Sequence, residues 1–194
     1  MEFVDVLAAR KSVRSYSDRD VPDDAVSFIL EAANSAPSAG DLQAYEIVVV
    51  RDKSVKAKLA RAALGQWFIA EAPVDLVFLA NPERSRWRYG SRGERLYCIQ
   101  DATIAATFAM LAATSLGLGT CWVGAFDDRA VLEAIEAESP LIPVAIISVG
   151  YPAEEPRTTP RRDIRELASL DKLGNPYPYK PVEPKLRRPA EILI

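Results

Sequence analysis

Residues 102–126 contain no charged side chain, and this stretch limits the possible folds of the chain more than any other feature. Its length alone would suffice to cross a bilayer. However, Gly117 and Gly119 should end a helix near Leu116, because glycine readily adopts the left-handed backbone that closes a helix. The helical part, residues 102–116, would be about 22 Å long, which is shorter than the roughly 30 Å hydrocarbon core. We therefore predict a buried core helix and no membrane partner.

The composition of the chain is that of a globular protein. Its 194 residues are 49% hydrophobic and 26% charged, so enough apolar surface exists to offset the entropy lost on ordering the chain. Strands that alternate with helices indicate a layered α+β or α/β domain around a central sheet. Apolar periodicity predicts helices over residues 3–9, 22–35, 53–64, 95–116 and 129–137, and β-branched runs predict strands over 45–50, 74–80, 120–123 and 142–149.

The last twenty residues are rich in proline, which excludes both a helix and a central strand there. We predict a domain over residues 1–170 and an extended, Pro-rich C-terminal arm over residues 171–194. Either this arm is a loose terminus, or its apolar side chains pack on a partner subunit. The prolines are Pro176, Pro178, Pro181, Pro184 and Pro189.

The chain contains no histidine, which excludes Ser-His-Asp and Cys-His catalytic sets and any His-ligated metal site. An enzyme with this composition would need a bound organic cofactor for its chemistry. Cys98 and Cys121 form no CxxC pair and no disulfide framework, and no secretory signal is visible, so we expect a cytoplasmic protein without a metal site. The net charge of −3 does not favour nucleic acid as a partner.

Two basic segments suit the binding of a phosphate. Arg10, Lys11, Ser12 and Arg14 place three cations and a hydroxyl within five residues, and arginine offers a planar fork of donors. Within residues 157–163, Arg161 or Arg162 could reach the same phosphate. The alternative for the first segment is a solvated basic turn.

Two small-residue segments suit the close approach of a flat ring. Residues 36–43 include Ser38, Asp41 and Gln43, which offer polar groups to the edge of a heterocycle. In residues 117–126, Gly124 offers a bare backbone N–H. The alternatives are a helix end followed by a loop for the first segment, and a helix cap with a turn for the second.

Taken together and in this order, these segments resemble the motifs of the FMN-dependent nitroreductase family. The resemblance runs from about residue 3 to residue 168. The matches are Arg10, Ser12 and Arg14 in an Arg-x-Ser-x-Arg/Lys motif, Pro37, Ser38 and Gln43 in a Pro-Ser-x-x-Asn-x-Gln-Pro-Trp loop, residues 117–124 in a Gly-Leu-Gly-Thr/Ser-x-Trp-x-Gly segment, and residues 150–152 and 160–161 near the end.

The resemblance implies an α+β fold with three α/β/α layers and a mostly antiparallel central sheet. It also implies a homodimer with FMN at the subunit interface and an arm that embraces the partner. Such an enzyme passes hydride from NADH or NADPH, through the flavin N5, to a small acceptor such as a nitroaromatic or a quinone. The flavin carries the chemistry, so no side chain is assigned a catalytic role.

The residues that the resemblance assigns to the cofactor fall into three groups. One group holds the phosphate and ribityl chain, a second comes from the other subunit to face the flavin, and a third lies beside the ring. In that order they are Arg10, Lys11, Ser12, Arg14, Arg161 and Arg162; Pro37, Ser38, Ala39 and Asp41; and Gln66, Val123 and Gly124.

The sequence departs from the family pattern at the flavin-facing loop. Asp41 stands in place of the common asparagine, Ala44 in place of the proline and Tyr45 in place of the tryptophan. A carboxylate at Asp41 would disfavour an anionic reduced ring and would repel anionic substrates. These departures bear on the acceptor more than on the cofactor.

Three alternatives follow from the residues. The first is an oxidoreductase of the kind just described, and the second is a flavin-binding carrier or sensor without turnover. The third rests on residues 84–95, which combine five arginines with Trp87 and Tyr89 and resemble a nucleic-acid patch. For that stretch we favour a mobile lid beside the flavin, which could meet the phosphates of NAD(P)H, over a solvated loop.

Overall fold

A four-stranded sheet in the order β1-β2-β4-β3 organises the chain, and every strand pair in it is antiparallel. The computed structural model describes residues 1–182. Strand β2 is central, and all seven of its residues are buried, as expected for a strand covered on both faces. The strands are β1 (Tyr45–Val50), β2 (Val74–Ala80), β3 (Gly119–Val123) and β4 (Ile142–Gly150).

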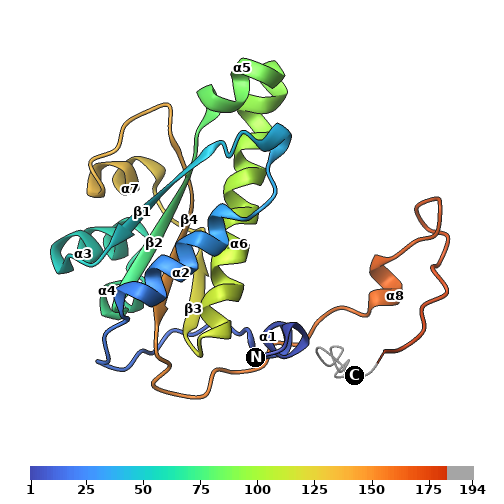
Figure 1. Cartoon of the computed structure of the whole chain (residues 1–194), viewed down its shortest axis with the longest axis horizontal. Coiled ribbons are helices and arrows are strands. Elements are labelled where there is room, and N and C mark those ends of the chain that lie inside the picture. Colours follow the sequence, from blue (N-terminus) through green and yellow to red (C-terminus); the bar gives the residue numbers. More distant parts are fainter. Residues whose placement is uncertain (183–194) are drawn as a thin grey trace. The chain divides into compact units, whose positions relative to one another are not determined.

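Helices cover both faces of this sheet (Figure 1). Helices α2 (Asp23–Asn34) and α6 (Cys98–Ser115) pack on one face. The opposite face is covered by α3 (Lys53–Ala62), α4 (Phe68–Glu71) and α7 (Asp128–Ala134). The predicted α+β fold with an antiparallel sheet is confirmed, in three layers.

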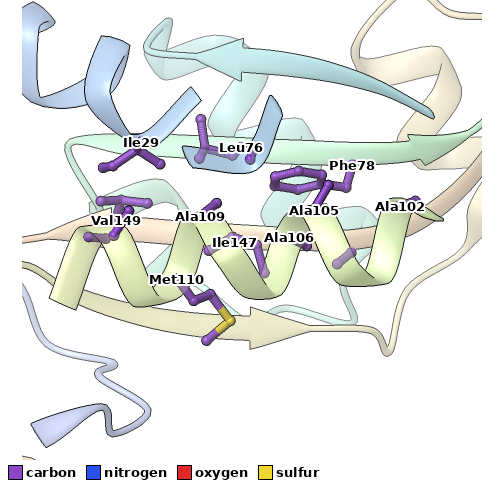
Figure 2. Packing of buried hydrophobic residues seen from close by; sticks show 14 of the residues in the cluster. Ile29, Leu76, Phe78, Ala102, Ala105, Ala106, Ala109, Met110, Ile147 and Val149 are labelled. Atoms are coloured by element: carbon purple, nitrogen blue, oxygen red, sulfur yellow. The ribbon is translucent and has the colours of Figure 1, made fainter. Parts of the chain in front are cut away.

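The uncharged stretch forms the C-terminal part of α6, as predicted. Alanines on one side of this helix lie against Phe78, Ile147 and Ile29, as Figure 2 shows. Small side chains allow the helix axis to approach the sheet closely. The helical run 82–115 is long and apolar enough to cross a membrane, but half of its most apolar 18-residue stretch is buried within the fold.

Residues 82–97 are helical, and they include residues 84–95, for which we predicted a mobile lid in preference to a solvated loop. They form α5 (Pro82–Arg92) and the π-helical turn η2 (Gly93–Tyr97), which runs directly into α6. The Asn81 side chain accepts a hydrogen bond from the Arg84 N–H, and Pro82 occupies the first turn. Both residues are typical of a helix start. Gly90, with φ of 56°, interrupts the regular helix.

The contacts within the chain divide it into two units. The sheet, its covering helices and the short helix η1 (Ala39–Asp41) belong to residues 10–156. The other unit combines residues 1–9 with the segment from residue 157 onward, and it contains α1 (Phe3–Ala9) and α8 (Ile164–Leu167). The predicted boundary at residue 170 stays a prediction, and the part of the predicted arm beyond residue 182 lies outside the described residues.

Candidate functional site

The basic segment, residues 10–14, lies along the start of β3. Ser12 forms an isolated parallel bridge with Thr120, and the Val13 N–H donates to the Thr120 carbonyl at 3.0 Å. Gly119 makes this contact possible, because a Cβ there would lie 2.5 Å from the Val13 side chain. The sequence thus joins two of its predicted motifs, since the glycine segment provides the surface on which the basic segment rests.

The cations of this segment gather around the middle of β3. Burial raises the pKa of the Cys121 thiol, and the nearby Arg14 and Arg10 oppose that rise. The Arg14 guanidinium also lies 5.9 Å from the centre of the Phe68 ring, a distance at which a cation and a ring attract. Lys11 is 3.7 Å from Glu155. The structure therefore brings Arg10 and Arg14 to one place on β3.

The end of β3 offers a bare stretch of backbone to solvent. Val123 is buried and Gly124 is exposed, and a Cβ at Gly124 would press on the Trp122 indole at 3.3 Å. The Gln66 amide donates to the Ala125 carbonyl at 3.3 Å and to the Ala63 carbonyl at 3.0 Å. Gln66 therefore holds the segment after β3 against the end of α3. A flat ring could approach Gly124 without meeting a side chain there.

The loop predicted to face the flavin, residues 37–41, lies at the other end of the same unit. Asp101, in the first turn of α6, accepts hydrogen bonds from the Ala39 N–H at 2.9 Å and from the Ala44 N–H at 3.3 Å. The Ser38 hydroxyl accepts from the Gln43 N–H. Gly40 and Asp41 have φ of 57° and 58°, a backbone that aspartate adopts more readily than most residues.

The two halves of the predicted site are therefore far apart within one chain. The loop is attached to the N-terminal end of α6, whereas the basic segment crosses β3 just beyond the C-terminal end of that helix (Figure 1). An 18-residue helix is about 27 Å long. The chain places Arg10, Lys11, Ser12 and Arg14 against β3, which ends at Val123 and Gly124 near Gln66, and it holds Pro37, Ser38, Ala39 and Asp41 separately at the start of α6.

The structure gives Arg161, Arg162 and Gln43 contacts of their own. Arg161 and Arg162 lie in the second unit, where Arg161 donates to the Pro160 carbonyl and Arg162 is 3.5 Å from Glu166. Their part in a phosphate site stays a prediction. The Gln43 amide donates to the Asn34 side chain at 2.8 Å, so this contact directs it toward the end of α2.

A buried polar cluster lies under the basic segment, and the sequence reasoning missed it. Asp75, Ser148 and Cys121 are register partners across β2, β4 and β3. The Tyr16 hydroxyl is 2.7 Å from the Ser148 hydroxyl and donates to the Val13 carbonyl at 2.8 Å. Burial raises the pKa of Tyr16 far above its ordinary value. Tyr16 therefore anchors the basic segment to the sheet as a neutral phenol.

Asp75 should make the stability of the protein depend on pH. Within residues 1–182, neither carboxylate oxygen of this fully buried side chain has a hydrogen-bond partner. Desolvation raises the pKa of Asp75 well above 3.8, although Lys56 opposes the rise. Between pH 3.8 and the raised pKa, Asp75 is ionised in the unfolded chain but keeps its proton in the folded protein. The contribution of Asp75 to stability therefore falls as pH rises through that window.

We expect Asp75→Asn to remove this dependence, because an amide does not ionise. In urea unfolding between pH 4 and pH 8, the free energy of unfolding of the variant should rise relative to that of the wild type as the pH rises. This difference should grow by up to about 1.4 kcal/mol per pH unit within the window. Parallel stability curves for the two proteins would contradict the assignment.

A surface hollow of about 590 Å³ lies elsewhere, between α3 and α7, and is lined by Lys58, Arg61, Asp127 and Glu133 among others. None of the predicted cofactor residues lines it. We place the candidate site along β3, where the basic segment lies against the start of the strand and Gln66 and Gly124 lie at its end.

Comparison with known proteins decides the family. A model of the nitroreductase family matches residues 7–73 and 63–151. The chain belongs to the nitroreductase family. This nitroreductase is similar to FMN reductase (NAD(P)H) of Bacillus subtilis, with 32% identity over 173 residues, which cover 82% of this chain and 70% of that protein. The oxidoreductase class expected from the sequence is confirmed at the level of the family.

Solved structures agree with this assignment. The nitroreductase fold described here superimposes on B. megaterium NfrA2 with a TM-score of 0.82 and 29% identity, over 89% of this chain and 75% of that one. An FMN-dependent nitroreductase from Clostridium difficile R20291 matches with a TM-score of 0.69 and 32% identity, over 79% of this chain and 90% of that one.

Proposed function

We propose that this nitroreductase carries hydride from NADH or NADPH to a small acceptor, such as a nitroaromatic or a quinone, over one pocket that contains FMN. The observation that supports the proposal is that the basic segment lies along β3, the strand after which the backbone is bare at Gly124. When bound, FMN would accept and release the electrons at its N5. The chain's own residues would bind and orient the reactants.

The candidate site fits this cofactor in charge and in shape. Arg10, Lys11 and Arg14 offer cations to a phosphate, and Ser12 adds a neutral donor at an exposed position. Gly124 would leave the edge of the flat ring system uncovered and could offer its backbone N–H near N5. Val123 and Gln66 would lie beside the ring, and Arg161 and Arg162 would complete the phosphate site. Without a histidine, the chain leaves water to supply the product's proton.

A second copy of the chain would complete each site. The loop 37–41 is bonded to the start of α6, whereas the basic segment lies on β3, which begins beyond the end of that helix, so one subunit would not bring both to the same ring. In a symmetric homodimer, the loop of one subunit faces the basic segment of the other, and two sites form. The arm would pack on the partner, which agrees with the exposure of Leu173, Tyr177 and Val182. The domain then spans residues 1–170 and the arm residues 171–194.

We further propose that this enzyme is cytoplasmic and that its partners are small molecules and a second copy of the chain, without a nucleic acid, a metal or a membrane. Visible absorption of the purified protein, recorded before and after anaerobic NADH or NADPH, tests the proposed function directly. We expect a flavin spectrum that bleaches within seconds at millimolar donor, as turnover rates typical of enzymes require. Bound flavin that stays oxidised with both donors would indicate the carrier or sensor. Failure to bind added FMN would overturn the proposal.

A further inference from the structure

Helix α5 and the turn η2 carry an excess of positive charge. Residues 82–97 contain five arginines and two glutamates, in a chain whose net charge is −3. Such a local excess attracts anions to one place on an otherwise acidic protein. The family assignment and the proposed FMN site use none of these arginines.

Arg84, Trp87 and Arg88 lie on one side of α5, which we call the arginine–tryptophan face. Their spacing of i, i+3 and i+4 places them side by side on a helix, and the helix is regular up to Gly90. The Arg88 guanidinium donates to the Gly40 carbonyl at 3.1 Å. Arg84 lies near enough to Tyr45 to influence its pKa. The arginine–tryptophan face therefore borders the loop 37–41.

The contact between α5 and this loop is tight. A Cβ at Gly40 would collide with the Tyr89 hydroxyl and lie 3.0 Å from the Arg88 guanidinium. The Tyr89 ring in turn packs edge-on against Tyr97, with ring centres 5.1 Å apart. The arginine–tryptophan face is thus held in place next to the loop that we propose to face the flavin.

This face has two side chains available for a ligand. The Trp87 side chain is 81% exposed. Within residues 1–182, the Arg84 side chain makes no hydrogen bond and no ion pair. Arg86 differs, because it points to another side of the helix and lies 3.9 Å from Glu94. A large exposed ring beside an unpaired guanidinium is the pair of groups that recognises a base and its phosphate.

We propose that the arginine–tryptophan face binds the adenosine-phosphate end of the nicotinamide nucleotide. This inference rests on the proposed function, since it places the far end of the hydride donor beside the loop that covers the flavin. The Trp87 indole stacks on the adenine ring, and the Arg84 guanidinium pairs with a phosphate. Arg88 adds positive charge while it holds the loop.

Direct binding tests the inference without any redox chemistry. Isothermal titration calorimetry of the full-length protein would use adenosine 2′,5′-bisphosphate and 5′-AMP as probes. We expect Trp87→Ala to weaken both probes about 5- to 150-fold, the range for loss of one aromatic stack on a base. Arg84→Ala should weaken the binding of both probes if Arg84 pairs with the 5′-phosphate. It should weaken the binding of the bisphosphate only if Arg84 pairs with the 2′-phosphate. Arg86→Ala, which removes the same charge from the same helix, should change neither affinity more than about twofold.

A kinetic comparison separates this inference from the proposed function. Reduced nicotinamide mononucleotide lacks the adenosine end, so Trp87→Ala and Arg84→Ala should raise the KM for NADPH or NADH and leave the KM for the mononucleotide unchanged. If wild type reduces no acceptor with any donor, the proposed function fails, whatever the calorimetry shows. If the substitutions raised the KM for the mononucleotide as much as the KM for the dinucleotide, the inference would fail and the proposed function would stand. Unchanged probe affinities in all variants would also overturn the inference, and so would a single-stranded oligoadenylate that binds at least about tenfold more tightly than 5′-AMP, which would assign the face to RNA.

Discussion

Replacing Arg10 and Arg14 together with alanine should weaken FMN binding roughly 100-fold or more and leave the protein folded. Each charge-assisted hydrogen bond to a phosphate contributes about 1.5–3 kcal/mol, and about 1.4 kcal/mol corresponds to a factor of ten. Both side chains lie at the surface of β3 rather than in the core, so folding does not depend on them. Quenching of flavin fluorescence on titration with the protein measures the affinity.

Riboflavin provides the control for this experiment, because it has the ring but no phosphate. Its affinity should change less than about threefold in the double variant. A charge-matched protein, Arg86→Ala with Arg129→Ala, removes two exposed arginines elsewhere and should bind FMN like the wild type. Equal losses of FMN and riboflavin would show that the basic segment supports the ring or the fold instead of the phosphate.

Mixed dimers should reveal that each flavin site is shared between subunits. We expect the Arg10→Ala/Arg14→Ala chain and a Gly40→Val chain each to bind FMN poorly when pure. Valine strains the backbone at Gly40, where φ is 57°, and collides with Tyr89 and Arg88, so the loop 37–41 is displaced. A heterodimer of the two chains has one site in which both halves are intact. It should therefore bind about one FMN per dimer with wild-type affinity.

The reverse arrangement makes the test decisive. A chain that carries all three substitutions, paired with a wild-type chain, leaves no site intact if the halves come from different subunits. If each site lay within one subunit, the wild-type chain would retain its own site and bind FMN normally. Two differently tagged chains, purified through both tags, give the heterodimers, and bound flavin is counted by absorbance. Flavin retained in this second heterodimer would contradict the shared site.

The sheet and the core helix could be predicted because their signals are local. The expected strands 45–50 and 74–80 agree with β1 and β2, since β-branched and apolar runs of that length form buried strands. The end of the long helix followed from Gly117, whose φ of 77° is easy only for glycine. Family motifs then supplied the candidate residues, because they pair residue types with spacing.

The remaining features depend on contacts between distant residues. Helix α5 was missed because its polar surface shows no apolar stripe, although the Asn81-Pro82 start was a usable signal. The hydrogen bonds of Asp101 to residues 39 and 44 could not be predicted, because they join residues about sixty positions apart in the sequence. Tyr16 and Asp75 come to lie on either side of Ser148 only after strands β2, β4 and β3 have paired. Pairing of this kind has no sequence period to reveal it.

Helix α6 spans the distance between the two proposed half-sites, which restricts how its length can change. Each residue inserted into a helix turns everything beyond it by about 100° and advances it by 1.5 Å. One extra residue between Asp101 and Ser115 would therefore turn Asp101, which holds the loop 37–41, out of phase with β3 and would disturb both proposed flavin sites at once. A change of about seven residues, close to two full turns, restores the phase but moves the half-sites some 10 Å apart. Surface loops of this enzyme are free to lengthen, whereas the length of α6 is set by both ends together.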